Sequence, residues 1–200
     1  MGDFYFNNQM LILKANNING KYIFTKALES NSPVIFPTDT IYGIGAFISD
    51  IKANEKIFKI KGRHKNKPFP ILISELKQLD MIIEQKITEE INKIINKYWP
   101  GPNTLIFKAK KNLPSLFVKN KTIAVRLIKE DWLVKIISHF NIPLSATSAN
   151  ISGESYSNNI VKIINDFSDD VSLFLTQKSD NKKSSKIIDI STKKIRIIRQ

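Results

Sequence analysis

A basic run holds the residues best suited to binding an anion, Lys59-Ile60-Lys61-Gly62-Arg63-His64-Lys65-Asn66-Lys67-Pro68. Lys61 and Arg63 flank a glycine, so both cations can converge on one anion. A triphosphate fits, because Arg offers a bidentate fork and Lys a point charge. For this run alone, a solvated helix C-terminus is an equal alternative, since Lys and Arg suit the helix dipole there.

Two other segments place hydroxyls and amides directly after an apolar strand. They are Val34-Ile35-Phe36-Pro37-Thr38-Asp39-Thr40-Ile41-Tyr42-Gly43 and Pro143-Leu144-Ser145-Ala146-Thr147-Ser148-Ala149-Asn150-Ile151-Ser152-Gly153. In open α/β sheets, polar loops at the carboxyl ends of strands line the ligand crevice. For either loop alone, ordinary turn and N-cap residues are the favoured explanation. Gly43-Ile44-Gly45 lacks a third glycine and is predicted to be a turn.

Several kinds of catalytic group are missing from the sequence. It has no cysteine, which excludes thiol catalysis, disulfides and zinc sites built with Cys. It has two histidines and no cluster of acids or histidines that indicates a dedicated metal site. Neither a Gly-x-Ser-x-Gly elbow nor a Gly-x4-Gly-Lys-Ser/Thr loop occurs, so a P-loop enzyme is excluded.

The chain carries a strong positive charge, with 31 basic and 18 acidic residues giving +13. This charge points to a nucleotide, RNA or an acidic membrane face as partner. Only four basic residues are arginines: Arg63, Arg126, Arg196 and Arg199. The many lysines, with abundant Ile and Asn, indicate codon bias as an equal explanation of the charge.

Apolar runs alternate with amphipathic stretches throughout the 200 residues, which predicts one α/β domain over residues 1–200. Predicted helices are 21–29, 51–61, 75–83, 88–98, 131–140 and 160–167. Predicted strands are 34–36, 69–73, 104–109, 123–126, one near 144, 172–175, 187–190 and 195–198. Residues 177–185 are predicted to be a mobile loop. We find no signal peptide in residues 1–9 and no apolar run of the roughly 20 residues that a membrane helix needs, and so expect a cytoplasmic protein.

Five motifs in order resemble the YrdC/TsaC family of threonylcarbamoyl-AMP synthases, over about residues 36–199. They are Pro37-Thr38-Asp39-Thr40-Ile41-Tyr42-Gly43-Ile44-Gly45, Ile60-Lys61-Gly62-Arg63 with Lys67-Pro68, Trp99-Pro100-Gly101-Pro102-Asn103-Thr104-Leu105, Ala124-Val125-Arg126, and Ser148-Ala149-Asn150-Ile151-Ser152-Gly153. The resemblance implies a YrdC-like twisted, open mixed α/β sheet with flanking helices and a positively charged concave site.

The implied activity is that of a nucleotidyltransferase. It joins L-threonine, bicarbonate and ATP into threonylcarbamoyl-AMP, with release of diphosphate and water. The resemblance also implies Mg²⁺ bound through the ATP phosphates. The product would pass to tRNA threonylcarbamoyl-transfer proteins, which modify the adenosine next to the anticodon.

The resemblance assigns site residues position by position. Lys61, Arg63 and Lys67 match positions around the ATP phosphates, with Lys61 and Arg63 as the expected catalytic residues. Further positions match ATP contacts: Thr122, Ser148, Asn150, Tyr156 and Arg199. Four positions match the threonine site: Thr40, Arg126, Ala146 and Ser185. Arg126 would take the threonine carboxylate. An arginine in a planar, bidentate site cannot be exchanged for lysine without losing geometry, and three of the four arginines fall in these positions.

Some positions depart from the family pattern. His64 stands where Pro is usual, Leu72 where His is common near threonine, and Lys186 where Thr is usual; the glycines before Ser185 and after Arg199 are missing. Two other functions stay open. A non-catalytic module that binds double-stranded RNA or tRNA, or weak RNA binding beside catalysis, would use the charge and the basic tail of residues 178–199; solvated lysines explain that tail better. A carbamoyl-transfer role, as in hydrogenase maturation proteins, would call for cysteine-rich motifs that this chain lacks.

Overall fold

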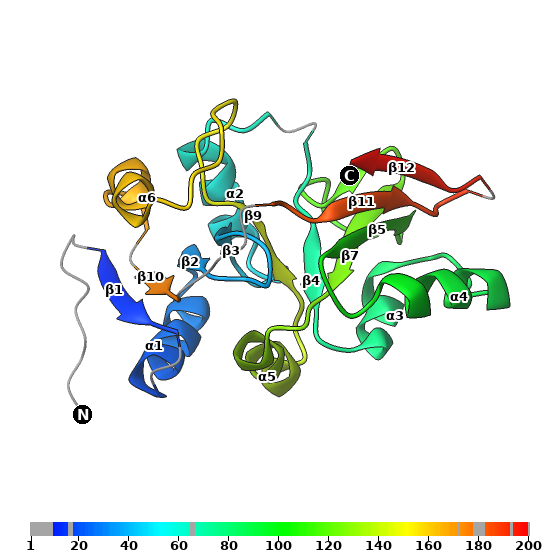
Figure 1. Cartoon of the computed structure of the whole chain (residues 1–200), viewed down its shortest axis with the longest axis horizontal. Helices are drawn as coiled ribbons and strands as arrows, with labels where there is room; N and C mark the ends of the chain where they lie inside the picture. The colour runs from blue at the N-terminus through cyan, green and yellow to red at the C-terminus, as the bar shows by residue number, and fades with distance from the viewer. Residues whose placement is uncertain are drawn as a thin grey trace.

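The structure is a computed structural model of the chain, and it describes residues 10–15, 18–64, 67–171, 173–177, 183–192 and 194–199. In these parts of the chain, the strands form two mixed sheets that stand side by side, with helices packed around them (Figure 1). The predicted fold class, a mixed α/β fold with twisted sheets and flanking helices, is confirmed.

The helices and strands follow one another along the whole described chain. The helices are α1 (Ile18–Glu29), α2 (Ile51–Ile60), the 3-10 helix η1 (Leu76–Gln78), α3 (Leu79–Ile82), α4 (Glu89–Tyr98), α5 (Asp131–Phe140) and α6 (Ile160–Phe167). The strands are β1 (Leu11–Lys14), β2 (Val34–Phe36), β3 (Gly43–Gly45), β4 (Ile71–Ile73), β5 (Asn103–Lys108), β6 (Val118–Lys119), β7 (Thr122–Leu127), β8 (Leu144–Ser145), β9 (Thr147–Ser148), β10 (Leu173–Thr176), β11 (Lys186–Asp189) and β12 (Arg196–Arg199).

The chain passes from one sheet to the other within a few residues. The first sheet has the order β1-β10-β2-β3-β9, and the second the order β12-β11-β5-β7-β4-β8, with β6 paired to β7. β8 belongs to the second sheet and β9 to the first, and Ala146 is the single residue between them. Hydrogen bonds to both sides hold this crossing: Ser145 N donates to Ala46 O at 2.8 Å, and Ala146 N donates to Pro70 O at 2.9 Å. The two sheets are therefore tied together at the start of the Ser148–Asn150 loop.

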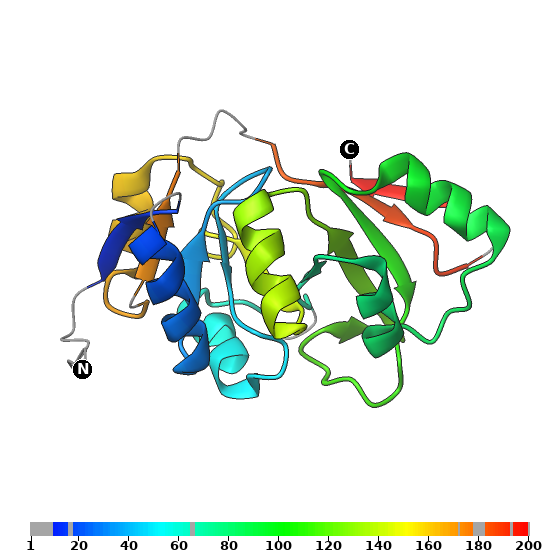
Figure 2. The same ribbon diagram turned by 90° about the horizontal axis from the view of Figure 1, so that it is seen from below.

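Aromatic side chains join the helices on one side of the molecule to the first sheet. The Phe24 ring of α1 packs edge-on against Trp132 of α5 at 5.3 Å and against Phe36 of β2 at 5.6 Å. All three side chains belong to one buried cluster, and Figure 2 shows α1 and α5 side by side on this face. A second buried cluster joins α2 and α6 to the sheets. Burial of such large apolar side chains is the main stabilising contribution to a fold of this kind.

Most predicted elements are confirmed, but one prediction is wrong. Gly43–Gly45 is not a turn; it is β3, which pairs with β2 on one side and β9 on the other. The predicted helix over 75–83 is broken into η1 and the four-residue α3. Besides β3, three further strands were not predicted, namely β1, β6 and β9. Residues 178–182 of the predicted mobile loop lie outside the described residues, as do Lys65, Asn66, Ser172, Lys193 and Gln200.

The close approach of β3 to β8 requires a glycine, which gives a test of the fold. A Cβ on Gly45 would lie 1.9 Å from Ser145 O, whereas a Cβ on Gly43 would have no neighbour nearer than 3.6 Å. We expect Gly45→Ala to lower the free energy of unfolding by about 3 kcal/mol, because the backbone must shift, and Gly43→Ala to lower it by less than about 1 kcal/mol. Guanidinium unfolding of both variants measures this, and equal losses would contradict the packing.

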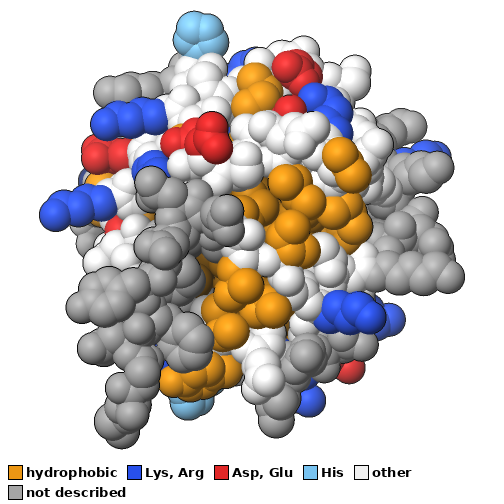
Figure 3. Space-filling view, turned by 90° about the vertical axis from the view of Figure 1, so that its left-hand side faces the viewer, with side chains coloured by type: hydrophobic (Ala, Val, Ile, Leu, Met, Phe, Trp, Pro, Cys, Tyr) orange, Lys and Arg blue, Asp and Glu red, His pale blue; other side chains and the backbone are white. Residues whose placement is uncertain are grey.

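One face of the molecule carries exposed hydrophobic side chains (Figure 3). It is the side formed by β1 and α6, where Leu11, Ile12, Ile160 and Val161 are exposed. Hydrophobic side chains are also exposed in β12 and just before it, namely Ile195, Ile197 and Ile198. In the described residues, no helix is both long enough and apolar enough to cross a membrane.

Candidate active site

Arg126 is a buried residue of β7 whose guanidinium is bound on three of its nitrogens. Nε donates to Gly101 O at 3.1 Å, and Nη1 donates to Thr40 Oγ1 at 2.8 Å. Nη2 forms an ion pair with Asp39 Oδ1. A guanidinium held in one plane suits the bidentate binding of a carboxylate. The structure thus brings together Thr40 and Arg126, two of the residues predicted to bind threonine.

Ser185 and Arg199 meet beside the start of β11. Arg199 donates to Ser185 O from Nε at 2.9 Å and from Nη2 at 2.7 Å, and Nη2 also lies 3.4 Å from Ser185 Oγ. The Ser185 hydroxyl shares a further hydrogen bond with Thr104 Oγ1 of β5, at 2.8 Å. Because Thr104 is buried, it fixes the position of the hydroxyl that is predicted to bind threonine.

Arg199 lies within electrostatic reach of Arg126. The pKa of Arg199 is lowered, first by burial and second by the positive charge of Arg126. Two neighbouring cations repel each other, and an anion bound close to both relieves that repulsion. The C-terminal strand thus supplies a second cation near the predicted carboxylate site, whereas the resemblance assigned Arg199 to the nucleotide.

Lys61 points into the protein rather than toward solvent. Its side chain is 1% exposed, and Nζ donates to Ser148 O at 2.5 Å and to Asn150 O. Burial, with a smaller effect from Arg63, lowers the pKa of Lys61 to about 7. The amino group thus holds the loop of the Ser-x-Asn motif, and its contact with the ATP phosphates stays a prediction.

The predicted nucleotide residues of this loop adjoin the loop that carries Thr40. Ser148 Oγ donates to Asn150 Oδ1 at 2.5 Å, so the two side chains of the motif are in contact. The Tyr156 hydroxyl accepts a hydrogen bond from Tyr42 N at 2.8 Å, and burial raises the pKa of Tyr156 to about 12. Tyr156 therefore links residues 148–156 to the segment two residues after Thr40.

Arg63 is anchored by the backbone of its own basic run. Nε donates to Lys67 O at 2.7 Å, Nη2 donates to Pro68 O at 3.2 Å, and the guanidinium lies 5.3 Å from the Phe69 ring centre. Burial lowers the pKa of Arg63. Within the described residues these bonds use two of the five N–H donors of a guanidinium, and the others remain for an anion. The Lys67 side chain is exposed.

Thr122 begins β7, and Arg126 lies near its other end. At about 3.3 Å per residue, the two lie about 13 Å apart along the strand. β4 runs parallel to β7, so the segment before β4, which anchors Arg63, enters at the Thr122 end. Thr122 Oγ1 donates to Lys119 O at 2.7 Å. The segment that anchors Arg63 and the buried Arg126 therefore lie toward opposite ends of this strand pair.

Two further positions that the family pattern associates with threonine carry apolar side chains. Ala146, predicted to bind threonine, lies at the crossing between the sheets and is half-buried. Leu72 is buried in the core and pairs in register with Arg126. A leucine offers no hydrogen bond, so the position where histidine is common contributes only apolar contact here.

Asp39 and Thr104 were missed by the prediction, although both lie inside the quoted motifs. Asp39 is paired to Arg126, and Thr104 is hydrogen-bonded to Ser185. The available signal was the residue type alone, a carboxylate next to Thr40 and a hydroxyl in an otherwise apolar strand. Neither could be paired with its partner before the order of the strands was known.

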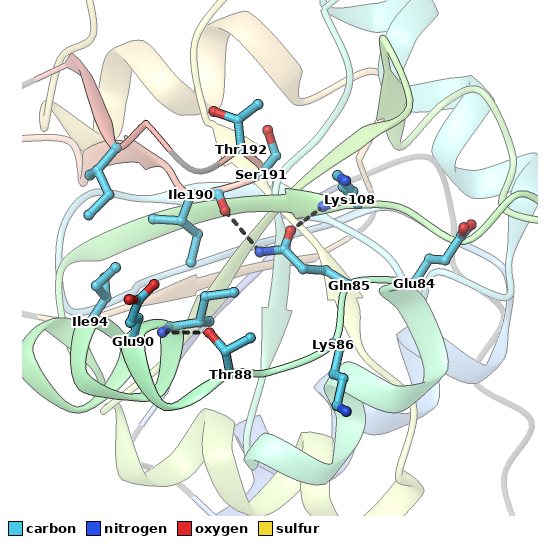
Figure 4. A pocket seen from close by; sticks show the side chains of 12 residues that line it. Glu84, Gln85, Lys86, Thr88, Glu90, Ile94, Lys108, Ile190, Ser191 and Thr192 are labelled. Atoms are coloured by element: carbon cyan, nitrogen blue, oxygen red, sulfur yellow. Dashed lines mark hydrogen bonds between the residues drawn. The ribbon is translucent and has the colours of Figure 1, made fainter.

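A separate cavity of about 470 Å³ lies between α4 and the strands β5 and β11 (Figure 4). Gln85 spans it, since Nε2 donates to Ile190 O at 2.8 Å and Oε1 accepts from Lys108 N at 2.9 Å. None of the predicted site residues lines this cavity. In the part of the chain that the structure describes, no group of three or more His, Asp or Glu side chains could hold a metal ion.

Comparison with known proteins places the chain in a family. The model of the Sua5/YciO/YrdC family, described as "Telomere recombination", matches residues 26–200. The chain belongs to the Sua5/YciO/YrdC family. The resemblance seen in the five sequence motifs is thereby confirmed.

Relatives in the Sua5/YciO/YrdC family carry the name threonylcarbamoyl-AMP synthase. The protein of that name from Pyrococcus abyssi is 35% identical over 135 residues, which are 67% of this chain and 39% of that protein. The one from Buchnera aphidicola is 29% identical over 84% of this chain and 97% of its own length. The chain therefore spans about two-fifths of the Pyrococcus relative and nearly all of the Buchnera one.

A solved structure in the family also matches the fold. The crystal structure of P. abyssi Sua5 complexed with L-threonine has a TM-score of 0.84 and 27% sequence identity. The match covers 95% of this chain and 57% of that one. Most of the described fold is thus shared with a family member whose structure was solved in complex with L-threonine.

Proposed function

We propose that this chain is an L-threonylcarbamoyladenylate synthase, a nucleotidyltransferase that uses L-threonine, bicarbonate and ATP. The observation that carries the proposal is the contact between Thr40 and Arg126, with Arg199 and Ser185 nearby. These four residues come from distant parts of the chain and offer a carboxylate site beside two hydroxyls. The threonine complex of P. abyssi Sua5 supports threonine as the ligand.

The proposed reaction needs no nucleophile from the protein. Bicarbonate takes up a proton and loses water to give CO₂. The neutral amine of threonine attacks its carbon and loses a proton, which gives a carbamate and balances the proton that bicarbonate took up. A carbamate oxygen then attacks the α-phosphorus of ATP, the bond from that phosphorus to the β-phosphate oxygen breaks, and diphosphate leaves. The protein holds the reactants in line and stabilises phosphate charge.

The residues take separate parts in this mechanism. Arg126 and Thr40 hold threonine at one end of the site, while Arg63, with the exposed Lys67, stabilises the negative charge of the phosphates at the other. Lys61 acts indirectly, because its hydrogen bonds to the backbone carbonyls of Ser148 and Asn150 fix the position of that loop. Mg²⁺ carried on the ATP phosphates would neutralise part of their negative charge, and the proposal assigns no side chain of the described residues to hold it. The product passes to tRNA threonylcarbamoyl-transfer proteins.

One assay tests the reaction class. We expect diphosphate release from ATP that requires both threonine and bicarbonate. Release that depends on carbamoyl phosphate would indicate a carbamoyl-transfer role. Binding of tRNA or double-stranded RNA without turnover would indicate the non-catalytic module.

Removing the Arg63 guanidinium should abolish the ATP-dependent step. We expect Arg63→Ala to lower kcat/KM for ATP at least about a hundredfold, since charge-assisted hydrogen bonds to the phosphates are lost. Arg196→Ala, at an exposed position of β12, is the matched control and should stay within about twofold of the wild type. Kinetics of diphosphate release measure both, and near-normal turnover of Arg63→Ala would remove this residue from the phosphate site.

A further inference from the structure

Asp39 places a carboxylate directly beside the proposed binding position of the threonine carboxylate. Its Oδ1 is paired with Nη2 of Arg126, the same guanidinium that holds Thr40 through Nη1. The Arg126 side chain is 5% exposed and that of Asp39 17%, so solvent screens the pair only weakly. A carboxylate in this position is unexpected in a site that is meant to attract an anion.

The loop that carries Asp39 is held in one conformation. Thr38 Oγ1 donates to Ile41 O at 2.8 Å and accepts from Thr40 N at 3.1 Å, which closes a tight polar turn around Asp39. Arg126 fixes the carboxylate at the tip of this turn. The carboxylate is thus positioned before any ligand arrives, and little conformational entropy is lost when it makes another contact.

We propose that Asp39 binds the α-amino group of threonine and so selects an amino acid over a plain carboxylate; this inference rests on the proposed function. In an α-amino acid, only one carbon separates the nitrogen from the carboxylate carbon. The N–H donors of a guanidinium form a rigid, compact fork, so two carboxylates bound to it are neighbours. A threonine carboxylate on Arg126 therefore brings its own nitrogen next to Asp39.

The charges of the site match a zwitterion. Arg126 and Arg199 supply two cations within electrostatic reach of each other, and Asp39 supplies an anion paired to the first. The carboxylate of threonine would lie near the cations and its ammonium near Asp39. A carboxylic acid that lacks the amine is attracted by the same cations and repelled by Asp39. It has no ammonium group whose attraction to Asp39 would offset that repulsion.

The same contact is compatible with the reaction. The threonine ammonium loses one proton to solvent to become the attacking amine, and it loses a second after it bonds to the carbon of CO₂, which replaces the proton that bicarbonate consumed. The carbamate nitrogen still carries one N–H. That N–H can donate to Asp39, which accepts through its carboxylate oxygens. Asp39 can therefore hold the nitrogen in both the amine and the carbamate, and no proton has to pass to Asp39.

The test compares the binding of two ligands to the wild type and to Asp39→Asn. The ligands are L-threonine and (R)-3-hydroxybutyrate, which keeps the carboxylate and hydroxyl of threonine and lacks the amine. Affinities are measured by ligand-observed NMR titration, without ATP or turnover. For the wild type we expect threonine to bind at least about tenfold more tightly, the size of a hydrogen bond between charged groups. In Asp39→Asn that preference should fall to about twofold or less.

The variants separate recognition from support of the fold. Asp39→Asn keeps an oxygen that can accept from Arg126. Asp50→Asn is the matched control, because Asp50 caps α2 through Ala53 N and asparagine caps equally well; its preference should stay as in the wild type. If Asp39→Asn lowered the affinity for both ligands by the same factor, the inference would be overturned, since Asp39 would then only position Arg126. An unchanged preference would overturn it too.

Two results keep the inference apart from the proposed function. A wild type that binds both ligands equally overturns the inference even if the variant does not fold. A wild type that binds threonine selectively but releases no diphosphate refutes the proposed reaction, and leaves the amine contact supported if Asp39→Asn loses the preference.

Discussion

Replacing Arg126 by lysine is expected to raise the KM for L-threonine at least about a hundredfold, with less than about a threefold change in the KM for ATP. Lysine keeps the positive charge but has one nitrogen, whereas Arg126 binds through three, to Gly101 O, Thr40 Oγ1 and Asp39. The substitution therefore loses the anchored, planar fork that can bind a carboxylate bidentately, and with it at least one charge-assisted hydrogen bond to threonine, worth about 1.5–3 kcal/mol. Kinetics of diphosphate release at varied threonine and varied ATP measure the effect.

The selectivity of this effect is the part that decides the assignment. Arg126 lies about 13 Å along β7 from Thr122 and from the segment that anchors Arg63. A displaced side chain at position 126 should therefore affect the binding of ATP only weakly. Arg196→Lys, on the exposed edge strand β12, is the control and should leave both KM values unchanged. If Arg126→Lys raised the KM for ATP as much as that for threonine, Arg126 would not be the carboxylate ligand.

Apart from the broken segment over residues 75–83, the helices were predictable because they have an amphipathic pattern and end signals. α4 begins at Thr88, whose side chain accepts from Ile91 N, and ends before Trp99-Pro100. α5 ends at Asn141, which adopts a left-handed conformation with φ of 51°. The short strands were less predictable, because their pairing depends on distant partners. β3 is the clearest case, since Gly43–Gly45 has no side-chain pattern of a strand, and glycine is required only because Ser145 approaches it.

The site was predictable as a set of positions but not as a set of contacts. The motifs pointed to Thr40 and Arg126, and the fold brings them together. The sequence could not show which way the Lys61 side chain points, because a lysine after a helix is equally compatible with solvent, a phosphate or a buried loop. The partners of Asp39 and Thr104 lie 87 and 81 residues away, so they depended on strand order.

Replacing Lys61 by methionine is expected to destabilise the fold by an amount that grows with pH. In the folded protein the pKa of Lys61 is about 7, against 10.5 for an ordinary lysine, chiefly because of burial. Between these two values the unfolded chain holds a proton that the folded protein has lost. The unfolding free energy of the wild type therefore rises with pH from about 7 to about 10.5, and below about 7 the cost of burying the charge is fully present.

Methionine removes this titration together with the hydrogen bonds to Ser148 O and Asn150 O. The difference in stability between wild type and variant should therefore increase from pH 6 to pH 10, by up to about 4 kcal/mol, since one unit of pKa difference corresponds to about 1.4 kcal/mol. Guanidinium unfolding at pH 6, 8 and 10 measures it. Lys59→Met, an exposed lysine on α2, is the matched control and should show a small difference at every pH.

The direction of this change decides what Lys61 does. A difference that grows with pH means that the neutral amine, held by two carbonyls of the Ser148–Asn150 loop, is the favoured form in the folded protein. A difference that shrinks as pH rises would mean that the charged form is favoured, as it would be if an anion faced it. Because Ser148 and Asn150 belong to the proposed nucleotide site, Lys61→Met should also raise the KM for ATP, and Lys59→Met should not.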